Sequence, residues 1–242
     1  MVRNKKPSKI NRSSRKSKDT ISLENELSEF YFSKEDSRHI AKVLRKSTGD
    51  QITITNGSGL EWQGELIHIS KNSTIAKKIK SFQHSPTDKT IHLSIAPTKN
   101  NNRMERMIEK LTELGIASIT PLVCEHSERK IDKALRFEKI AIAALKQSQQ
   151  FYLPKIQKLQ SFSDFITGNI TNGYIAHCGN SPKKQLASFN LNQDKVTLLI
   201  GPEGDFSLKE IELAEQGGIH SVSIGNQRLR TETAGLLACH TV

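Results

Sequence analysis

From residue 90 onward, short apolar runs alternate with stretches whose apolar residues recur at helical spacing. The runs ASITPLV, YIAHC, KVTLLI and HSVSI have the length and composition of buried strands. Between them, SLKEIELAEQ and TAGLLAC read as helices. Two further helices are indicated by apolar residues at helical spacing. The first set is Met104, Met107, Ile108, Leu111 and Leu114, followed by a helix stop at Gly115, and the second is Phe137, Ile140, Ala141, Ala144 and Leu145. Strands that alternate with helices favour a mostly parallel sheet with helices on both faces. The sequence therefore predicts an α/β domain over residues 90–242.

A different pattern precedes this domain. SKEDSRHIAKVLRK predicts a short helix with a serine cap, and GDQITITNGSGLEWQGELIHI predicts two strands joined by a turn at Asn56-Gly57. Trp62 and Leu66 share one strand face while Ile67 and Ile69 fall on the other, so a bulge or a partly two-sided strand stays open. STIAKKIKSF and TIHLSIA read as further strands. A short helix with several antiparallel strands predicts a small β-barrel domain at residues 26–84, and HSPTDKT, residues 84–90, is the linker.

The N-terminal residues 1–25 are polar and almost without apolar side chains, which predicts a basic disordered tail. Its first 20 residues hold eight basic side chains against Asp19, so they contribute +7 of the net charge of +11. A solvated arm and a non-specific phosphate contact are both open as its role. A basic protein attracts polyanions such as RNA, DNA or anionic lipid, so the charge alone does not select a partner.

Several classes of protein are disfavoured. No apolar run is long enough to cross a bilayer and no apolar stretch follows the basic N-terminus, so we expect no membrane, no secretion signal and a cytoplasmic location. Three scattered cysteines without a CxxC pair predict neither disulfides nor a metal site. The motifs GxGxxG, GxxxxGK[ST], HExxH and GxSxG are absent, which argues against nucleotide-phosphate cradles, zinc proteases and serine hydrolases.

Two predicted strands run into unusual loops. KVTLLI is followed by Gly201-Pro202-Glu203-Gly204, and HSVSI is followed by Gly225 and then by RLRTETA. Glycines next to proline allow a tight turn with exposed backbone N–H and C=O groups. Because ligands of open parallel sheets bind beyond the carboxyl ends of the strands, these loops predict the binding site.

The paired loops resemble the signature of SPOUT-class methyltransferases, in particular the 16S ribosomal RNA uridine N3-methyltransferase family. The resemblance covers roughly residues 30–240, and its blocks follow in order: RHIAKVLRKSTGD with NGSG, RMERMIEKLTELGIASITPLVCEHSERK, FEKIAIAALKQSQQFYLPKI, IGPEGDFSLKE and SIGNQRLRTETA. It implies a PUA-like β-barrel RNA-binding domain followed by a SPOUT α/β domain, with a mostly parallel sheet and a C-terminal trefoil knot. Knots are very rare in proteins, so this expectation rests on the resemblance alone.

The resemblance also implies an activity, S-adenosylmethionine-dependent methylation of N3 of a uridine in 16S ribosomal RNA, free or in the small ribosomal subunit, by a homodimer. The cofactor-binding residues would be His177, Leu199, Ile200, Gly201, Pro202, Glu203, Ile224, Gly225, Leu229, Arg230, Thr231 and Ala234. A slot for adenine needs apolar walls with a few backbone hydrogen bonds, which suits these residues.

For catalysis, we expect Arg230 to stabilise the anion that forms on uridine, and Glu203 or Glu232 to accept its proton. An ion pair between Arg230 and either glutamate that only shapes the loop is the alternative. RNA-binding candidates are Arg38, His39, Arg45, Lys110, Arg129, Gln147 and Gln150. The same fold methylating another base or a ribose, and a non-catalytic RNA-binding protein, remain alternative functions.

Two departures from the family pattern lead to further expectations. The usual short opening strand is replaced by NELSE before FYFS, so the first barrel strand is expected to be altered or missing. The chain ends at Val242, soon after RLRTETA, which predicts a short last helix and a weaker dimer surface.

Overall fold

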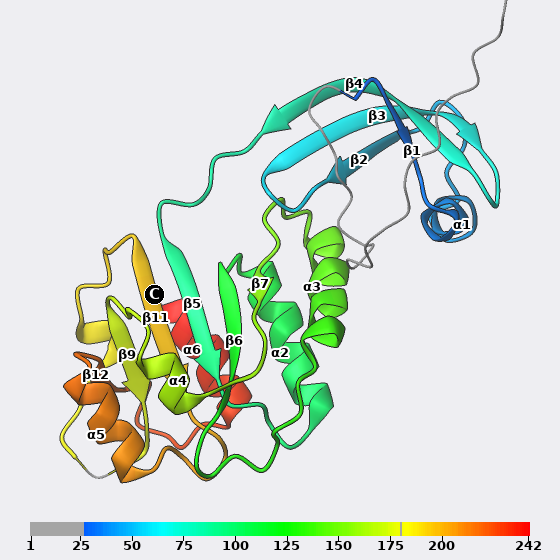
Figure 1. The fold of residues 1–242 in the computed structure, drawn as a ribbon. Coiled ribbons are helices and arrows are strands. Elements are labelled where there is room, and N and C mark those ends of the chain that lie inside the picture. The colour runs from blue at the N-terminus through cyan, green and yellow to red at the C-terminus, as the bar shows by residue number, and fades with distance from the viewer. Residues whose placement is uncertain (1–26, 180) are drawn as a thin grey trace, which may run out of the picture. The chain divides into compact units, whose positions relative to one another are not determined.

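The computed structural model describes residues 27–179 and 181–242, so the predicted basic tail lies outside the described residues. The chain divides into two compact units. The first contains the described residues up to Asn56 together with Trp62–Ser81, and the second contains Gly57–Glu61 and Phe82–Val242. Figure 1 shows both, with an antiparallel sheet in the first unit and a sheet flanked by helices in the second.

The first unit is a four-stranded sheet with one helix. Its elements are β1 (Glu29–Tyr31), α1 (Lys34–Lys42), β2 (Gln51–Thr55), β3 (Leu60–Ile69) and β4 (Thr74–Gln83), and the strand order is β1-β4-β3-β2. The Ser33 hydroxyl accepts a hydrogen bond from the Asp36 amide and caps α1, as predicted. A first strand does form, since β1 pairs antiparallel with β4 and buries Phe30. The expectation that this strand is missing is therefore wrong.

Trp62 is the centre of the first unit's core. Its side chain is fully buried, its ring lies 6.2 Å from that of Phe30, and its indole N–H donates to the Leu27 carbonyl at 3.1 Å. A Cβ at Gly64 would come within 2.3 Å of the indole, so only glycine leaves room for this ring. Leu66 is fully buried on the same face while Ile67 is exposed, which confirms the two predicted faces of this strand.

The second unit is built on an eight-stranded parallel sheet. Its strands are β5 (Thr90–Ile95), β6 (Ser118–Val123), β7 (Lys155–Ile156), β8 (Gln160–Ser161), β9 (Gly173–Ala176), β10 (Lys184–Gln185), β11 (Lys195–Ile200) and β12 (His220–Ser223). The order is β10-β12-β9-β11-β5-β6-β7, with β8 also pairing with β6. The sequence pattern groups TIHLSIA with the front strands, and this prediction is wrong, because β5 pairs in parallel with β11 and β6.

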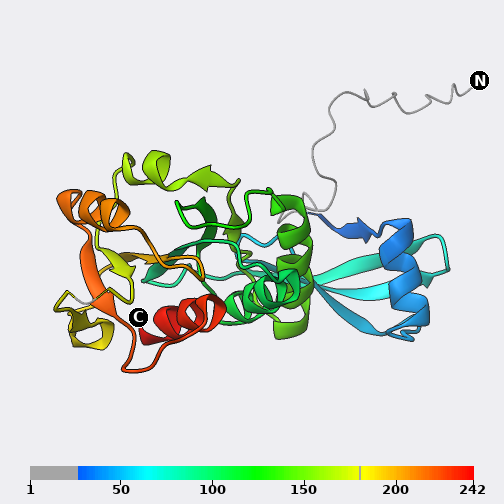
Figure 2. The same ribbon diagram turned by 90° about the horizontal axis from the view of Figure 1, so that it is seen from below.

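Helices cover both faces of this sheet, as Figure 2 shows. They are α2 (Asn101–Glu113), α3 (Ala134–Ser148), α4 (Phe162–Ile166), α5 (Leu208–Gln216) and α6 (Thr231–Thr241), with a short 3₁₀ turn η1 at Leu186–Ser188. Along β11, Leu198 and Ile200 pack with α2, α3 and α6, whereas Leu199 packs with α4 and α5. This alternation is what burial of both faces of a parallel strand requires.

Most of the predicted helical stripes are core. Leu114 is the exception, because α2 ends at Glu113 and the Leu114 side chain is 48% exposed. Gly115 follows with φ +76°, a left-handed conformation that suits glycine at a helix end. Within the described ranges, no helix has the length and apolar character needed to span a membrane.

Candidate functional site

Three neighbouring strands of the second unit end at the same level. Ala176, the last residue of β9, is paired with Ile200 of β11 on one side and with Val222 of β12 on the other. The loops that start at His177, Gly201 and Ile224 therefore leave the sheet side by side at its carboxyl edge. Both predicted glycine loops are at this edge.

The loop after β12 runs along that edge. It starts at β12, which lies on the side of β9 away from β11. Residues 224–230 nevertheless lead into α6, which packs against β11 and β5. A Cβ at Gly235, in the second turn of α6, would lie 3.0 Å from the Ile95 side chain at the carboxyl end of β5. Residues 224–230 must therefore pass the ends of β9 and β11, where the other two loops begin.

The loop after β11 is tied to its neighbours. Gly201 and Pro202 are buried, and a Cβ at Gly201 would lie 3.0 Å from the Phe206 ring and 3.1 Å from its amide nitrogen. The Glu203 carboxylate accepts a hydrogen bond of 3.0 Å from the Lys99 amide, in the loop between β5 and α2. The Asp205 carboxylate accepts one of 2.7 Å from the Cys178 amide. The backbone at this edge is therefore held in place from two sides.

His177 is the most unusual polar residue of the edge. Its side chain is only 7% exposed, and neither ring nitrogen has a hydrogen-bond partner among the described residues. Burial lowers the pKa of the imidazole and nearby Lys183 lowers it further, against the opposing charges of Asp205 and Glu215. A buried polar group without a partner is costly, so a neutral ring here is suited to pair with a bound ligand.

The three predicted catalytic residues lie at this edge with different partners. The Glu232 carboxylate, in the first turn of α6, is 3.7 Å from Nε of Arg103. Glu203 is engaged with the Lys99 amide. Arg230 is exposed at the N-cap of α6, and in the described part of the chain its guanidinium forms no salt bridge. The alternative in which Arg230 is paired with one of these glutamates is therefore wrong for this structure.

The other predicted cofactor residues differ in what they expose. Leu199 and Ile200 are buried on opposite faces of β11, so only their backbone groups face the edge. Thr231 is buried at the start of α6. Four predicted residues are half-buried or exposed: Ile224, Gly225 and Leu229 in the loop after β12, and Ala234 near the start of α6.

The RNA-binding candidates are less uniform. Arg38, His39 and Arg45 are exposed on or after α1, and Gln147 is exposed on α3. Lys110 is paired with Glu109 and Glu113, and Arg129 donates to the Asn101 side chain at 2.7 Å. The Gln150 amide lies 3.4 Å from the Glu113 carbonyl. The first four side chains are therefore more available than the last three.

Sequence reasoning missed Asp205 and the Lys99 amide. Asp205 has φ +66°, a conformation that aspartate tolerates better than most residues. An aspartate directly after a glycine in a strand-to-helix loop was the available signal. The Lys99 contact is made by a backbone amide, so no residue type marks it.

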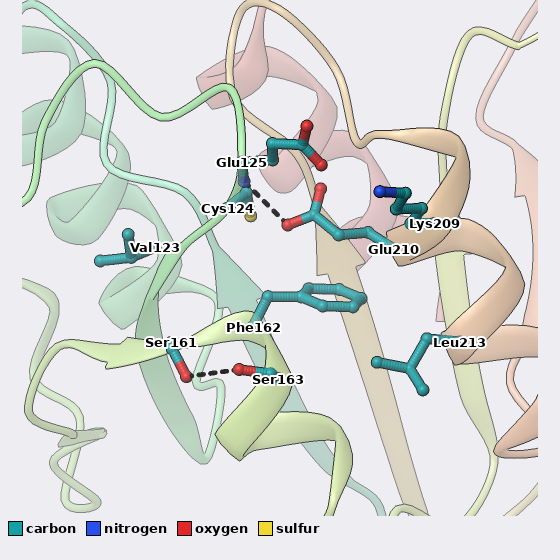
Figure 3. Close-up of a pocket in the computed structure, with 9 residues that line it drawn as sticks. All are labelled: Val123, Cys124, Glu125, Ser161, Phe162, Ser163, Lys209, Glu210 and Leu213. Atoms are coloured by element: carbon teal, nitrogen blue, oxygen red, sulfur yellow. Dashed lines mark hydrogen bonds between the residues drawn. The ribbon is translucent and has the colours of Figure 1, made fainter.

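A separate open groove of about 320 Å³ lies between the end of β6, α4 and α5. Figure 3 shows its lining, with the Glu210 carboxylate accepting from the Glu125 amide at 2.9 Å, and Ser161 and Ser163 joined at 3.0 Å. None of the predicted cofactor residues lines this groove. The ligand site indicated by the loops is therefore distinct from it.

Comparison with known proteins agrees with this architecture. The RNA methyltransferase domain family matches residues 85–242, and the RNA methyltransferase PUA domain family matches residues 32–79. A protein named ribosomal RNA small subunit methyltransferase E from Buchnera aphidicola subsp. Acyrthosiphon pisum is 32% identical over 228 residues, covering 88% of this chain and 87% of its own.

Two solved structures are also similar. A probable rRNA-methyltransferase from Porphyromonas gingivalis has a TM-score of 0.80 and 35% identity, covering 87% of this chain and 90% of its own. A putative methyltransferase from Legionella pneumophila, in complex with SAM, has a TM-score of 0.79 and 30% identity, covering 88% of this chain and 90% of its own. The fold and the paired loops thus define an RNA methyltransferase fold with an added PUA domain. The chain belongs to the ribosomal RNA small subunit methyltransferase E family.

Proposed function

We propose that this protein transfers a methyl group from S-adenosylmethionine to N3 of a uridine in 16S ribosomal RNA. The observation that carries the proposal is the meeting of the loops after β9, β11 and β12 at one edge of the sheet. The names of the relatives and the SAM bound to the Legionella protein support the substrate and the donor. In this proposal, residues 26–84 would contact RNA and residues 90–242 would catalyse the methyl transfer. The protein would act in the cytoplasm.

The chain's residues fit the donor. The turn at Gly201–Pro202 follows the buried apolar residues Leu199 and Ile200, and the loop at residues 224–231 adds the half-buried Ile224 and Leu229. Buried His177 offers ring nitrogens that have no hydrogen-bond partner among the described residues. These features suit an adenosine, which needs an apolar slot and a few polar contacts. When bound, S-adenosylmethionine supplies an electrophilic methyl carbon on a sulfonium sulfur.

The protein's own tasks are to orient the acceptor, exclude water and manage one proton. Uridine N3 carries a proton near neutral pH, and its loss leaves an anion spread over O2 and O4. Arg230, at the N-cap of α6 and without a carboxylate partner among the described residues, would stabilise that anion. Glu203 or Glu232 would accept the proton, although each already has a structural partner.

The Glu203 contact yields a test of its role. An amide oxygen can still accept from the Lys99 amide, so Glu203→Gln should keep turnover within about threefold if Glu203 positions the loop. Glu203→Ala should then lower the affinity for S-adenosylmethionine by about tenfold. If Glu203 accepts the proton, both variants lose about 10²–10⁴ in turnover. Methylation rates of an rRNA fragment and calorimetric affinities distinguish the two roles.

The trefoil knot and the homodimer belong to the same proposal. The passage of the chain from β12 along the carboxyl edge to α6, which packs against β5, is compatible with a threaded C-terminal segment. RNA would contact the exposed Arg38, His39 and Arg45 of the first unit and Gln147 of the second, with Lys110, Arg129 and Gln150 requiring rearranged partners.

Reverse transcription across 16S rRNA from cells with and without this gene tests the modification. An N3 methyl group blocks the pairing edge of uracil, so we expect a strong stop at one uridine only when the gene is present. A gene-dependent ribose methyl group without that stop would favour another methyltransferase of this fold. Absence of any gene-dependent modification, together with no binding of S-adenosylmethionine, would favour a non-catalytic RNA-binding protein.

A further inference from the structure

Asp205 occupies a strained position in the loop after β11. Its φ is +66°, and its amide donates to the Pro202 carbonyl at 2.9 Å, which closes the turn formed by residues 202–205. A left-handed backbone costs free energy for any residue with a Cβ. A side chain kept at such a position therefore needs a compensating contact.

The Asp205 carboxylate makes two backbone contacts. One oxygen accepts from the Phe206 amide at 2.9 Å, and the other accepts from the Cys178 amide at 2.7 Å. The first is local, but the second joins residues 27 positions apart in the sequence and on neighbouring loops. Hydrogen bonds from amides to a carboxylate are stronger than those between neutral groups, so the second bond links the two loops firmly.

A third loop contacts the same residue. Nδ1 of His126, in the loop after β6, lies 3.1 Å from the Asp205 carbonyl oxygen. A Cβ at neighbouring Gly204 would lie 3.0 Å from the His126 Cβ, so the two loops are closely packed. Asp205 thus contacts the loops after β9 and β6 from the loop after β11.

The contact with Cys178 lies next to buried His177, whose ring nitrogens have no hydrogen-bond partner in the described part of the chain. The charged groups that act on this imidazole are Lys183, Asp205 and Glu215. Asp205 therefore influences His177 in two ways, through the main chain of the adjacent residue and through its negative charge.

We propose that Asp205 is a positioning residue that clips the loops after β9 and β11 together and thereby sets the shape of the methyl-donor pocket. This inference rests on the proposed function, because it assumes that S-adenosylmethionine binds between these loops. Asp205 need not touch the donor. It fixes the main chain of Gly201–Pro202 on one side and of His177 on the other.

Three substitutions distinguish the effect of the Asp205 carboxylate contact with Cys178 from the effect of the backbone strain at residue 205. Asp205→Ala removes the carboxylate and keeps the strain, Asp205→Gly removes both, and Asp205→Asn keeps the size with only one good acceptor. Asp194→Ala, at the opposite end of the β11 region, is the matched control. Affinity for S-adenosylmethionine is measured by calorimetry, and the unfolding temperature is measured without ligand.

We expect Asp205→Ala and Asp205→Gly to weaken the affinity by at least about tenfold, and Asp205→Asn by less, while Asp194→Ala binds like the wild type. Unfolding of the ligand-free variants should stay cooperative. If Asp205→Gly binds as tightly as the wild type, strain alone matters and the inference is overturned. If the wild type does not bind S-adenosylmethionine, the proposed function fails instead.

A second readout follows the charge of Asp205. In the NMR titration of ligand-free protein, the His177 ring should have a lower pKa in Asp205→Asn than in the wild type, because a carboxylate that favours the imidazolium is removed. A carboxylate that turned away from the loop after β9 would leave this pKa unchanged. An unchanged His177 titration in Asp205→Asn would therefore contradict the position of the Asp205 carboxylate next to Cys178.

Discussion

Replacing Arg230 with alanine is expected to lower the methylation rate by about 10²–10³-fold, the range found when a preorganised donor to a developing anion is removed. The guanidinium is exposed at the N-cap of α6 and, among the described residues, forms no salt bridge. Affinity for S-adenosylmethionine should change by less than about tenfold, because the loop backbone, apolar side chains and His177 are expected to make most of the contacts with the donor. Single-turnover rates on an rRNA fragment and calorimetry measure the two effects separately.

Arg228→Ala is the matched control, since Arg228 is an exposed arginine two residues earlier on the same loop. It should keep most of the activity. Arg230→Lys should recover only part of the rate, because an ammonium lacks the planar pair of donors that spans two oxygens. Unchanged turnover and unchanged affinity in Arg230→Ala would remove this residue from the mechanism.

Replacing Trp62 with alanine is expected to destabilise the first unit by about 3–5 kcal/mol, the usual cost of truncating a buried large aromatic residue. The ring is fully buried, and its N–H is bonded to the Leu27 carbonyl. Because the two units are separate compact bodies, the second unit should still bind S-adenosylmethionine. Hydrogen exchange read by mass spectrometry should show fast exchange in β2–β4 and native protection in β5, β9 and β11.

Trp62→Phe is the control for volume, because it loses the indole N–H but retains a large ring. It should destabilise the first unit by clearly less than Trp62→Ala. Affinity for rRNA should fall in proportion to the unfolded fraction of the first unit. A loss of donor binding that parallels the loss of structure in β2–β4 would show that the second unit depends on the first.

The α/β part of the fold followed from sequence because its signals are local. Period and length distinguish KVTLLI from SLKEIELAEQ, and Ser207 with Glu210 forms the capping box that begins α5. Short strands such as β7 and β10 were missed because two residues carry no periodicity. TIHLSIA was grouped with the wrong sheet because a strand's partners depend on its topology, which its own residues do not encode.

The position of the site also followed from sequence, since both glycine loops follow strands and parallel strands present their carboxyl ends at one edge. The contacts within the site did not. The partners of Glu203, Glu232 and Asp205 lie between 27 and 129 positions away along the chain. Only the folded backbone brings them together, so the sequence alone could not decide whether Arg230 pairs with Glu203 or Glu232. Among the described residues it pairs with neither.

Amide hydrogen exchange with and without S-adenosylmethionine tests most directly whether these loops bind a methyl donor. The full chain should gain protection in residues 199–204 and 224–231, with little change in the groove segments around Glu125, Ser161 and Leu213. Protection confined to the groove segments, or no protection at saturating donor, would contradict the assignment of the pocket to the loops after β11 and β12.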